Sequence, residues 1–408
     1  MGLGVPGLAF IKKVNIPTAV LKKFTDFLPL VSMACHAGGM VLCCAQAGLH
    51  IHPATEISCF LRRYAALWTS FSTGSAMIVR LLTSCSITLS ALVFLLLSLV
   101  PSPLQAGSLR IVYGNDNLGE LAPCGSCDPL YRRGGMAKKA TFLKSLDGDM
   151  PLLLLDAGNL LFQTPALANA PAGAEKARTV ARGVMDANRR LGFRIAAVGM
   201  HDLSAGPAFL REAAGEDFTW LSANLRDQRS GALLFPAFTT VQVDTLTVGV
   251  VGLTGQIEEA QASRWGYSVA PWQQVLPQLV AEIRPRVHIL VLLSNNPLLE
   301  NRKIAESCPE VDLIFQSGFA RGNLPPLAAG SALINQTEIR GRYLGLLEID
   351  WQGPGSWHQR PVKTPFQGSS YAQKFINLNF DVQDDRSMTK MVDDIEKCSE
   401  PASSEIPR

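Results

Sequence analysis

The fold is indicated most clearly by four leucines followed by a polar turn, Leu152-Leu-Leu-Leu-Asp156-Ala-Gly-Asn159. The run Leu152–Leu155 is too short for a helix and carries no polar side chain, which is typical of a strand covered on both faces. Strands of this kind occur in parallel sheets with helices on the outside. The turn that follows brings a carboxylate and an amide to the carboxyl end of the strand, where α/β sheets bind their ligands.

The segments on either side repeat this alternation of apolar strand and amphipathic helix. Ala174–Leu191 has helical periodicity, with Val180, Val184 and Leu191 on one stripe. The pattern therefore predicts a layered α/β domain with buried sheets. Its other predicted strands are Leu109–Tyr113, Arg194–Val198, Thr219–Leu221, His288–Leu293 and Val311–Phe315, and its other predicted helices are Met136–Leu146, Pro207–Ala214, Gln273–Ile283 and Leu298–Ser307.

Two places predict antiparallel pairing inside this domain. Ala237–Val243 and Thr247–Gly252 lie close together in the sequence, and we expect them to pair. We also expect Ser331–Asn335 to pair with Tyr343–Asp350. These late, closely spaced strands would make the sheet mixed.

The composition limits the class of protein. The chain has 408 residues, of which 47% are apolar and 17% are charged, so it can bury a sizeable core and is not mainly disordered. Its net charge is +3, but residues 1–106 carry seven Lys/Arg against two Asp/Glu, so residues 107–408 are net acidic. A net-acidic body lacks the electrostatic footprint of a protein that binds nucleic acid. Long uncharged runs occur only near the N-terminus, which excludes a polytopic membrane protein.

The N-terminal region predicts export. Leu81–Val100 carries no charge, Arg80 stands before it and Ala106 follows it, which is typical of a signal peptide cleaved after Ala106. The predicted location is periplasmic or secreted, without membrane contact after cleavage. An uncleaved inner-membrane anchor through residues 81–100 is the alternative, because twenty apolar residues can span a bilayer.

Four segments follow from these patterns. A signal peptide begins at the start of a chain, so we expect translation to start at Met77. The predicted segments are an upstream extension over residues 1–76, the signal peptide over 77–106, the α/β domain over 107–378, and a C-terminal helix near Met388–Ile395 with a tail over 379–408.

The polar side chains gather in the loops after the predicted strands. These loops are Gly114-Asn-Asp-Asn-Leu-Gly119, Asp156-Ala-Gly-Asn159, Gly199-Met-His-Asp202, Ser294-Asn-Asn296 and Gln316-Ser-Gly-Phe-Ala320. Other blocks in the same order are Arg133-Gly-Gly-Met-Ala-Lys-Lys-Ala140, Leu221-Ser-Ala-Asn-Leu225 and Val248-Gly-Val-Val-Gly-Leu-Thr254. Together, over residues 108–380, they resemble the metallophosphoesterase domain of the periplasmic 5′-nucleotidase and UDP-sugar hydrolase family.

The resemblance implies a fold, a cofactor and a ligand. The fold is the four-layer αββα sandwich of the calcineurin-like metallophosphoesterase type. The cofactor is a pair of divalent ions (Mn, Zn or Mg), roughly 3.5–4 Å apart, which activate water and clamp a phosphate. The implied ligand is a phosphate ester, and the implied setting is nucleotide catabolism.

A residue-by-residue match to the family's metal ligands leaves few of them. Asp116 matches the first Asp, and Asn159 stands at the position of the bridging Asp. The other five ligand positions, which hold His or Asn in the family, are occupied by Leu118, Met200, Asn295, Gly318 and Ala320.

Most of these replacements cannot coordinate a hard cation. Leu, Gly and Ala side chains have no lone pair, and Met offers only a soft thioether. Asn159 offers a neutral amide oxygen in place of the anionic bridge between the ions. Because uncompensated buried charge is very costly, we predict that the ordinary two-metal centre does not form and that phosphoester hydrolysis is weak or lost.

His201 and Asp202 match the family's catalytic pair, in which the His protonates the leaving group. One interpretation makes them a general acid with an orienting carboxylate, which would contribute about 10²–10⁴-fold. The other makes them inherited residues with a structural role at a strand end. The sequence leaves both open.

Cys124-Gly-Ser-Cys127 lies in the loop after the first predicted strand. A disulfide or redox pair, a thiolate metal-ligand set joined by Cys308, and a plain structural loop all remain open. Pro123-Cys124-Gly125 is similar to a segment that some relatives carry in place of the usual metal-binding stretch, which makes the lost ligands a subfamily feature.

Two functions follow. The first is an exported phosphoesterase-like hydrolase, weakly active or rebuilt around Asp116, Cys124, Cys127, Asn159 and His201. The second is a non-catalytic periplasmic binding or assembly module on the same scaffold.

Overall fold

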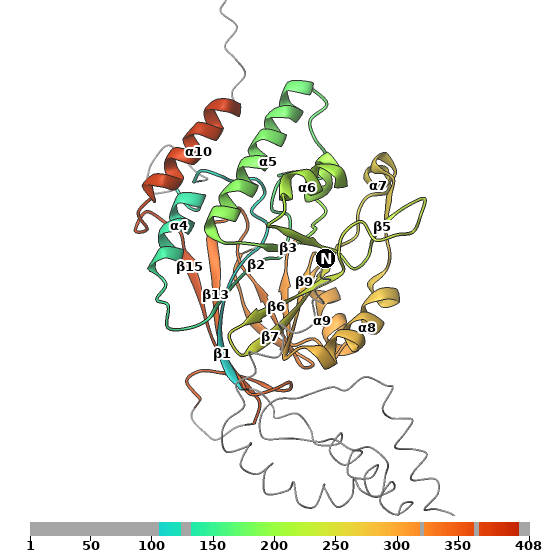
Figure 1. Ribbon diagram of the computed structural model, residues 1–408, viewed down its shortest axis with the longest axis vertical. Helices are drawn as coiled ribbons and strands as arrows, with labels where there is room; N and C mark the ends of the chain where they lie inside the picture. The colour runs from blue at the N-terminus through green and yellow to red at the C-terminus, as the bar shows by residue number, and fades with distance from the viewer. Residues whose placement is uncertain (1–105, 124–131, 319–321, 363–366, 400–408) are drawn as a thin grey trace, which may run out of the picture. The chain divides into compact units, whose positions relative to one another are not determined.

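Two β-sheets form the centre of the structure (Figure 1). The computed structural model describes residues 106–123, 132–318, 322–362 and 367–399, all within the unit Pro103–Arg408. The first sheet has seven strands in the order β14-β15-β13-β1-β2-β3-β4. Its strands are β1 (Gly107–Gly114), β2 (Leu152–Asp156), β3 (Ile195–Ala197), β4 (Thr219–Leu221), β13 (Tyr343–Trp351), β14 (Trp357–Gln359) and β15 (Ser369–Asn377).

The second sheet has six strands in the order β11-β12-β10-β9-β7-β6. A separate two-stranded sheet pairs β5 (Leu225–Asp227) with β8 (Tyr267–Val269). The six strands are β6 (Phe238–Val243), β7 (Leu246–Leu253), β9 (Ile289–Ser294), β10 (Leu313–Gln316), β11 (Leu324–Ala329) and β12 (Ala332–Gln336).

Helices cover the outer face of each sheet, which gives four layers (Figure 1). One apolar cluster joins the first sheet to α4, α5, α6 and α10, and another joins the second sheet to α8 and α9. A third cluster, with Ile111 and Val248 among its buried members, lies between the sheets. The helices are α4 (Met136–Ser145), α5 (Pro171–Leu191), η4 (Asp202–Ala205), α6 (Pro207–Ala214), α7 (Glu259–Trp265), α8 (Trp272–Ile283), η5 (Arg284–Arg286), α9 (Leu298–Ser307) and α10 (Arg386–Ser399).

The longest helix, α5, illustrates how the sequence sets the elements. It begins at Pro171, whose missing N–H costs nothing in a first turn, and it ends at Gly192 in the left-handed conformation. Its predicted apolar stripe does face the first sheet, because Val184 is fully buried and Val180 packs against the same cluster.

The carboxyl ends of the parallel strands meet at one edge of the sandwich. Strands β1 to β4 are parallel to one another, and so are β7, β9, β10 and β12. Hydrogen bonds join the loops of the two sheets there: the Ser317 hydroxyl donates to the Ala157 carbonyl at 2.6 Å, and the Thr254 hydroxyl donates to the Val198 carbonyl at 2.9 Å. The loops with the family resemblance therefore lie together.

The structure confirms one predicted strand pair and corrects the other. β6 and β7 pair antiparallel, as expected. The pairing of Ser331–Asn335 with Tyr343–Asp350 is wrong: β12 pairs with β10 and β11 in the second sheet, whereas β13 pairs with β1 and β15 in the first. The short link between them crosses from one sheet to the other, and proximity in sequence does not reveal such a crossing.

The upstream extension and the signal peptide remain predictions. Residues 1–76 and the uncharged run 81–100 lie outside the described residues. Within the ranges that the structure describes, no helix has the length and hydropathy needed to cross a membrane.

Candidate functional site

Buried polar side chains gather at the edge where the two sheets bring their strand ends together. We call this group the strand-end cluster. It comes from the loops after β1, β2, β3, β9 and β10, and each of its members is at most 3% exposed. They are Asn115, Asp116, Asn159, Asp202, Asn295 and Ser317.

The carboxylate of Asp116 is occupied by hydrogen-bond donors. Its Oδ1 accepts from the Asn159 side-chain amide at 2.9 Å and from the Gly318 N–H at 2.7 Å. Its Oδ2 accepts from the Asn115 side-chain amide at 3.1 Å. Burial raises the pKa of Asp116, and these three bonds oppose that rise because they favour the ionised form.

Both polar atoms of the Asn159 side-chain amide form hydrogen bonds. Its Nδ2 donates to Asp116, and its Oδ1 accepts from the His201 N–H at 3.0 Å. The amide oxygen that would have to replace the bridging carboxylate is therefore already used, and the amide nitrogen is directed at the retained acid. Asn159 and Asp116 lie together as the sequence predicts, but they bond to each other.

The backbone at the inherited ligand positions is strained. Asp116, Leu118 and Asn159 have φ values of 48°, 55° and 55°, the left-handed region that non-glycine residues rarely adopt. For Leu118 this conformation costs roughly 1–2 kcal/mol, whereas Asp and Asn adopt it more readily. Leu118 is half-buried and belongs to none of the apolar clusters of the described residues. The strain in these loops is therefore concentrated at Leu118.

Asp202 is bonded to the backbone. Its Oδ2 accepts from the N–H groups of Asn159 at 2.8 Å and Gly199 at 2.9 Å, and its Oδ1 accepts from Leu161 N–H at 2.9 Å. Burial raises its pKa to about 7 against the effect of these bonds. Asp202 therefore ties the loop after β2 to the loop after β3.

His201 stands apart from that carboxylate. Its Nδ1 is buried and has no hydrogen-bond partner among the described residues, so Asp202 does not orient the ring through this atom. Burial lowers the pKa of His201, while backbone groups of Phe162 and Gln163 act in the opposite direction. A neutral imidazole at neutral pH is a weaker general acid than the protonated ring.

Asn295 links the loop after β9 to the loops after β3 and β10. It is fully buried, its Oδ1 accepts from the Met200 N–H at 3.0 Å, and its Nδ2 donates to the Ser317 hydroxyl at 2.9 Å. A Cβ added at Gly318 would lie 2.5 Å from the Asn295 amide nitrogen. A His side chain at position 318, as in the family, would not fit this arrangement.

A buried cation near the cluster was not predicted from the sequence. Lys139, on the inner face of α4, donates to the Asn117 side chain at 2.8 Å. Burial lowers its pKa to about 8, and the negative charge of Asp156 partly opposes this. Burial also raises the pKa of Asp156 to about 6. The sequence does contain one sign of this buried cation. Lys139 lies three residues after the start of a helix that follows the Gly134-Gly135 turn.

The residues present do not fit a two-metal centre. Each oxygen of Asp116 faces an N–H donor that a cation would have to displace, and the Asp202 carboxylate of the same cluster is bonded to three backbone N–H groups. Among the described residues, no group of three or more His, Cys, Asp or Glu side chains is placed to hold a metal ion. We therefore derive no chemical step through a metal here.

The predicted cysteine site falls largely outside the structure. Cys124 and Cys127 lie outside the described residues. Cys308 is fully buried in the apolar cluster beneath α8 and α9, and burial raises the pKa of its thiol to about 11. A protonated thiol in an apolar site is not a metal ligand.

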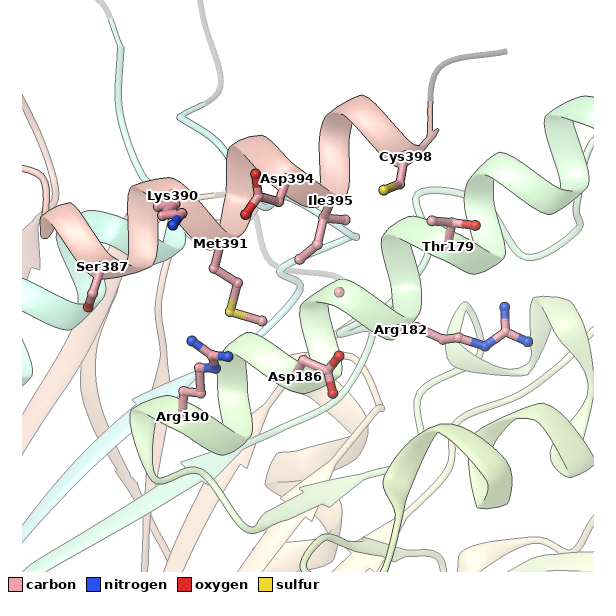
Figure 2. Close-up of a pocket in the computed structure, with 11 residues that line it drawn as sticks. Thr179, Arg182, Asp186, Arg190, Ser387, Lys390, Met391, Asp394, Ile395 and Cys398 are labelled. Atoms are coloured by element: carbon pink, nitrogen blue, oxygen red, sulfur yellow. The ribbon is translucent and has the colours of Figure 1, made fainter. Parts of the chain in front are cut away.

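A large hollow lies away from the strand ends, between α5 and α10 (Figure 2). We call it the α5–α10 groove, and its volume is about 680 Å³. Arg190, Lys390 and Asp394 line it and form no ion pair within the described part of the chain. It is therefore a solvated, charged surface, unlike the strand-end cluster.

Comparison with known proteins identifies the fold. No protein-family model matches the chain. It is similar to a 5′-nucleotidase precursor from Thermus thermophilus, with 21% identity and a TM-score of 0.54 over 71% of this chain and 59% of that one. It is also similar to the Thermus thermophilus sulfate thiohydrolase SoxB, with 17% identity and a TM-score of 0.56. This match covers 74% of this chain and 61% of SoxB. It is similar as well to the calcineurin-like phosphoesterase YfkN from Bacillus subtilis, with 13% identity and a TM-score of 0.54. This match covers 72% of this chain and 98% of YfkN.

One curated protein is similar over a short stretch. The chain is 27% identical over 84 residues to the uncharacterized metallophosphoesterase YunD of Bacillus subtilis (strain 168), which is 21% of this chain and 18% of YunD. The chain thus spans less than two thirds of YunD and of both Thermus thermophilus proteins.

These similarities show that the chain has the metallophosphoesterase fold. The predicted αββα sandwich of the calcineurin-like type is confirmed, and so is the resemblance to the 5′-nucleotidase group.

Proposed function

We propose that the chain is an exported protein of the metallophosphoesterase fold that has lost two-metal hydrolysis and works as a binding or assembly module. One observation carries this proposal: the retained Asp116 carboxylate accepts three hydrogen bonds from N–H donors at 2.7–3.1 Å. These donors use the lone pairs with which Asp116 would bind a divalent ion, so a cation would have to displace them.

The charge balance supports the same proposal. Asp116, Asp156 and Asp202 are buried, and the hydrogen bonds that each accepts from the described residues come from backbone or side-chain amide N–H groups. Buried carboxylates that are satisfied in this way need no metal for stability. The export part of the proposal is supported by the predicted signal peptide over residues 77–106.

The test combines metal content with turnover. The full chain is incubated with Mn²⁺ or Zn²⁺, dialysed and measured by elemental analysis, then assayed with p-nitrophenyl phosphate and a nucleoside monophosphate. We expect well below one ion per chain and no hydrolysis above background. Two stoichiometric ions together with turnover would overturn the proposal.

A weak hydrolase that depends on His201 is the second candidate. The buried Nδ1 of His201 favours it, because no described residue hydrogen-bonds to this nitrogen and competes for a proton there. The matched variants are His201→Ala and His358→Ala, the latter on the edge strand β14. Metal-free turnover that only His201→Ala abolishes would establish this candidate in place of the first.

A further inference from the structure

A second hollow opens at the carboxyl ends of β7 and β9, between the starts of α8 and α9. Its volume is about 360 Å³, within the size range of small-molecule sites. Two consecutive asparagines separate it from the strand-end cluster. Asn295 bonds to Met200 and Ser317 of the cluster, whereas Asn296 lines this hollow.

Side-chain amides dominate the polar lining. Gln256 and Gln273 are exposed at the rim, and neither side chain has a hydrogen-bond partner in the described part of the chain. Asn296 is 7% exposed, and its Nδ2 donates to the Ser294 hydroxyl at 3.2 Å. Its amide oxygen accepts no hydrogen bond from any described residue and reaches solvent, so it remains available to a donor. A hydroxyl group entering the hollow would supply one.

In the described part of the lining, no charged side chain is free to bind a ligand. Glu300 is its one ionisable residue, and both of its oxygens are used: one accepts from the Trp272 indole N–H at 3.2 Å, and the other pairs with Lys303 at 2.6 Å. No lysine, arginine or histidine is among the described residues that line it. A phosphate or carboxylate would therefore meet the Glu300 carboxylate and no cationic side chain of the described lining.

We propose that this hollow binds a neutral monosaccharide. Three amides offer donors and acceptors to ring hydroxyls, while Val269, Pro271 and Pro297 offer apolar surface to the face of the ring. A nucleoside fits less well, because base recognition relies on stacking, and the single aromatic ring of the lining, Trp272, is only 9% exposed. The inference goes beyond the proposed function and does not depend on the state of the strand-end cluster.

The test is a binding screen on the full chain. Isothermal titration uses glucose, galactose, mannose and N-acetylglucosamine up to about 20 mM, which covers millimolar affinities. Adenosine, uridine and glucose 6-phosphate complete the panel. We expect at least one neutral sugar to bind, while glucose 6-phosphate does not.

Two variants locate the binding. Gln273→Leu removes an exposed rim amide and should weaken sugar binding about tenfold, the effect of one lost hydrogen bond. Gln228→Leu, at an exposed glutamine outside the hollow, should leave it unchanged. Circular dichroism checks that both variants are folded. Binding of only the nucleosides or the sugar phosphate, binding by no member of the panel, or equal effects of the two variants would each overturn the proposal. None of these outcomes depends on metal content or phosphatase activity.

Discussion

Polar side chains are hydrogen-bonded within the protein in the strand-end cluster but exposed to solvent in the α5–α10 groove. In the cluster, buried side chains such as Asp116 and Asp202 find donors within the protein at 2.7–3.1 Å. In the groove, Arg190, Lys390 and Asp394 leave their charges to solvent (Figure 2). The strand ends therefore form a packed polar cluster in which amide and backbone N–H groups satisfy the carboxylates. An unsatisfied buried carboxylate would cost more than the fold can tolerate.

The strongest loss of stability should follow from removing a buried acceptor. Asp202→Ala deletes the partner of three backbone N–H groups and leaves them unsatisfied, so the free energy of unfolding should fall by roughly 4 kcal/mol or more. Urea denaturation measures it. The matched substitution in the groove, Asp394→Ala, should leave the midpoint unchanged. Equal effects at the two sites would remove the contrast between the regions.

A pH series should show the next largest difference between the two regions. Burial raises the pKa of Asp156 to about 6 from an ordinary 3.8, so the folded state holds this proton more tightly than the unfolded state. The resulting stability is present below pH 4 and is lost as the pH rises through 6, by roughly 3 kcal/mol. Lys139 and Asp116 are the charged groups that act on it.

The variant Asp156→Asn should make the stability profile less steep between pH 4 and pH 6, while Asp202, whose pKa burial raises to about 7, keeps the remaining slope. Denaturation at each pH measures it, and Asp394→Asn in the groove serves as the control that keeps the slope. A wild-type slope in Asp156→Asn would contradict the assignment.

The substitution Asn159→Asp restores the family's acidic residue and should destabilise the protein. It places a second carboxylate where an amide now donates to Asp116 at 2.9 Å, at a cost of about 2 kcal/mol. Excess Mn²⁺ should not recover the loss in thermal unfolding, because the other ligands are missing. The double exchange of Asn159→Asp with Asp116→Asn should recover part of it. Full rescue by the metal would mean that the cluster remains a cation site.

The smallest change concerns the strained loop. Leu118→Gly should raise the free energy of unfolding by about 1 kcal/mol, because glycine adopts a φ of 55° without a Cβ clash. Leu118→Ala, which keeps the Cβ, should show no such gain in the same urea experiment. Loss of stability in both variants would show that Leu118 packs in a way that offsets its strain.

Much of the fold could be predicted because strands and helices here have local signatures. Periodicity predicted α6 and α9 with their full bounds, and it placed β7 beside β6. It did not predict β11, whose Leu324-Pro-Pro-Leu327 opening is unusual for a strand, nor the separate sheets of β12 and β13. Those features depend on which edge is free once the sheets have formed, and local sequence does not encode this.

The amino-acid sequence was enough to predict the αββα fold and to place the polar loops, among them those of Asp116, Asn159 and Asp202, after its strands. What those side chains do became visible only in the folded chain. Folding turns Asn159 toward Asp116, directs Asp202 to the backbone and brings Lys139 into the interior. The reason is physical: composition sets the available donors and charges, but packing selects which of them become buried within hydrogen-bond distance of one another.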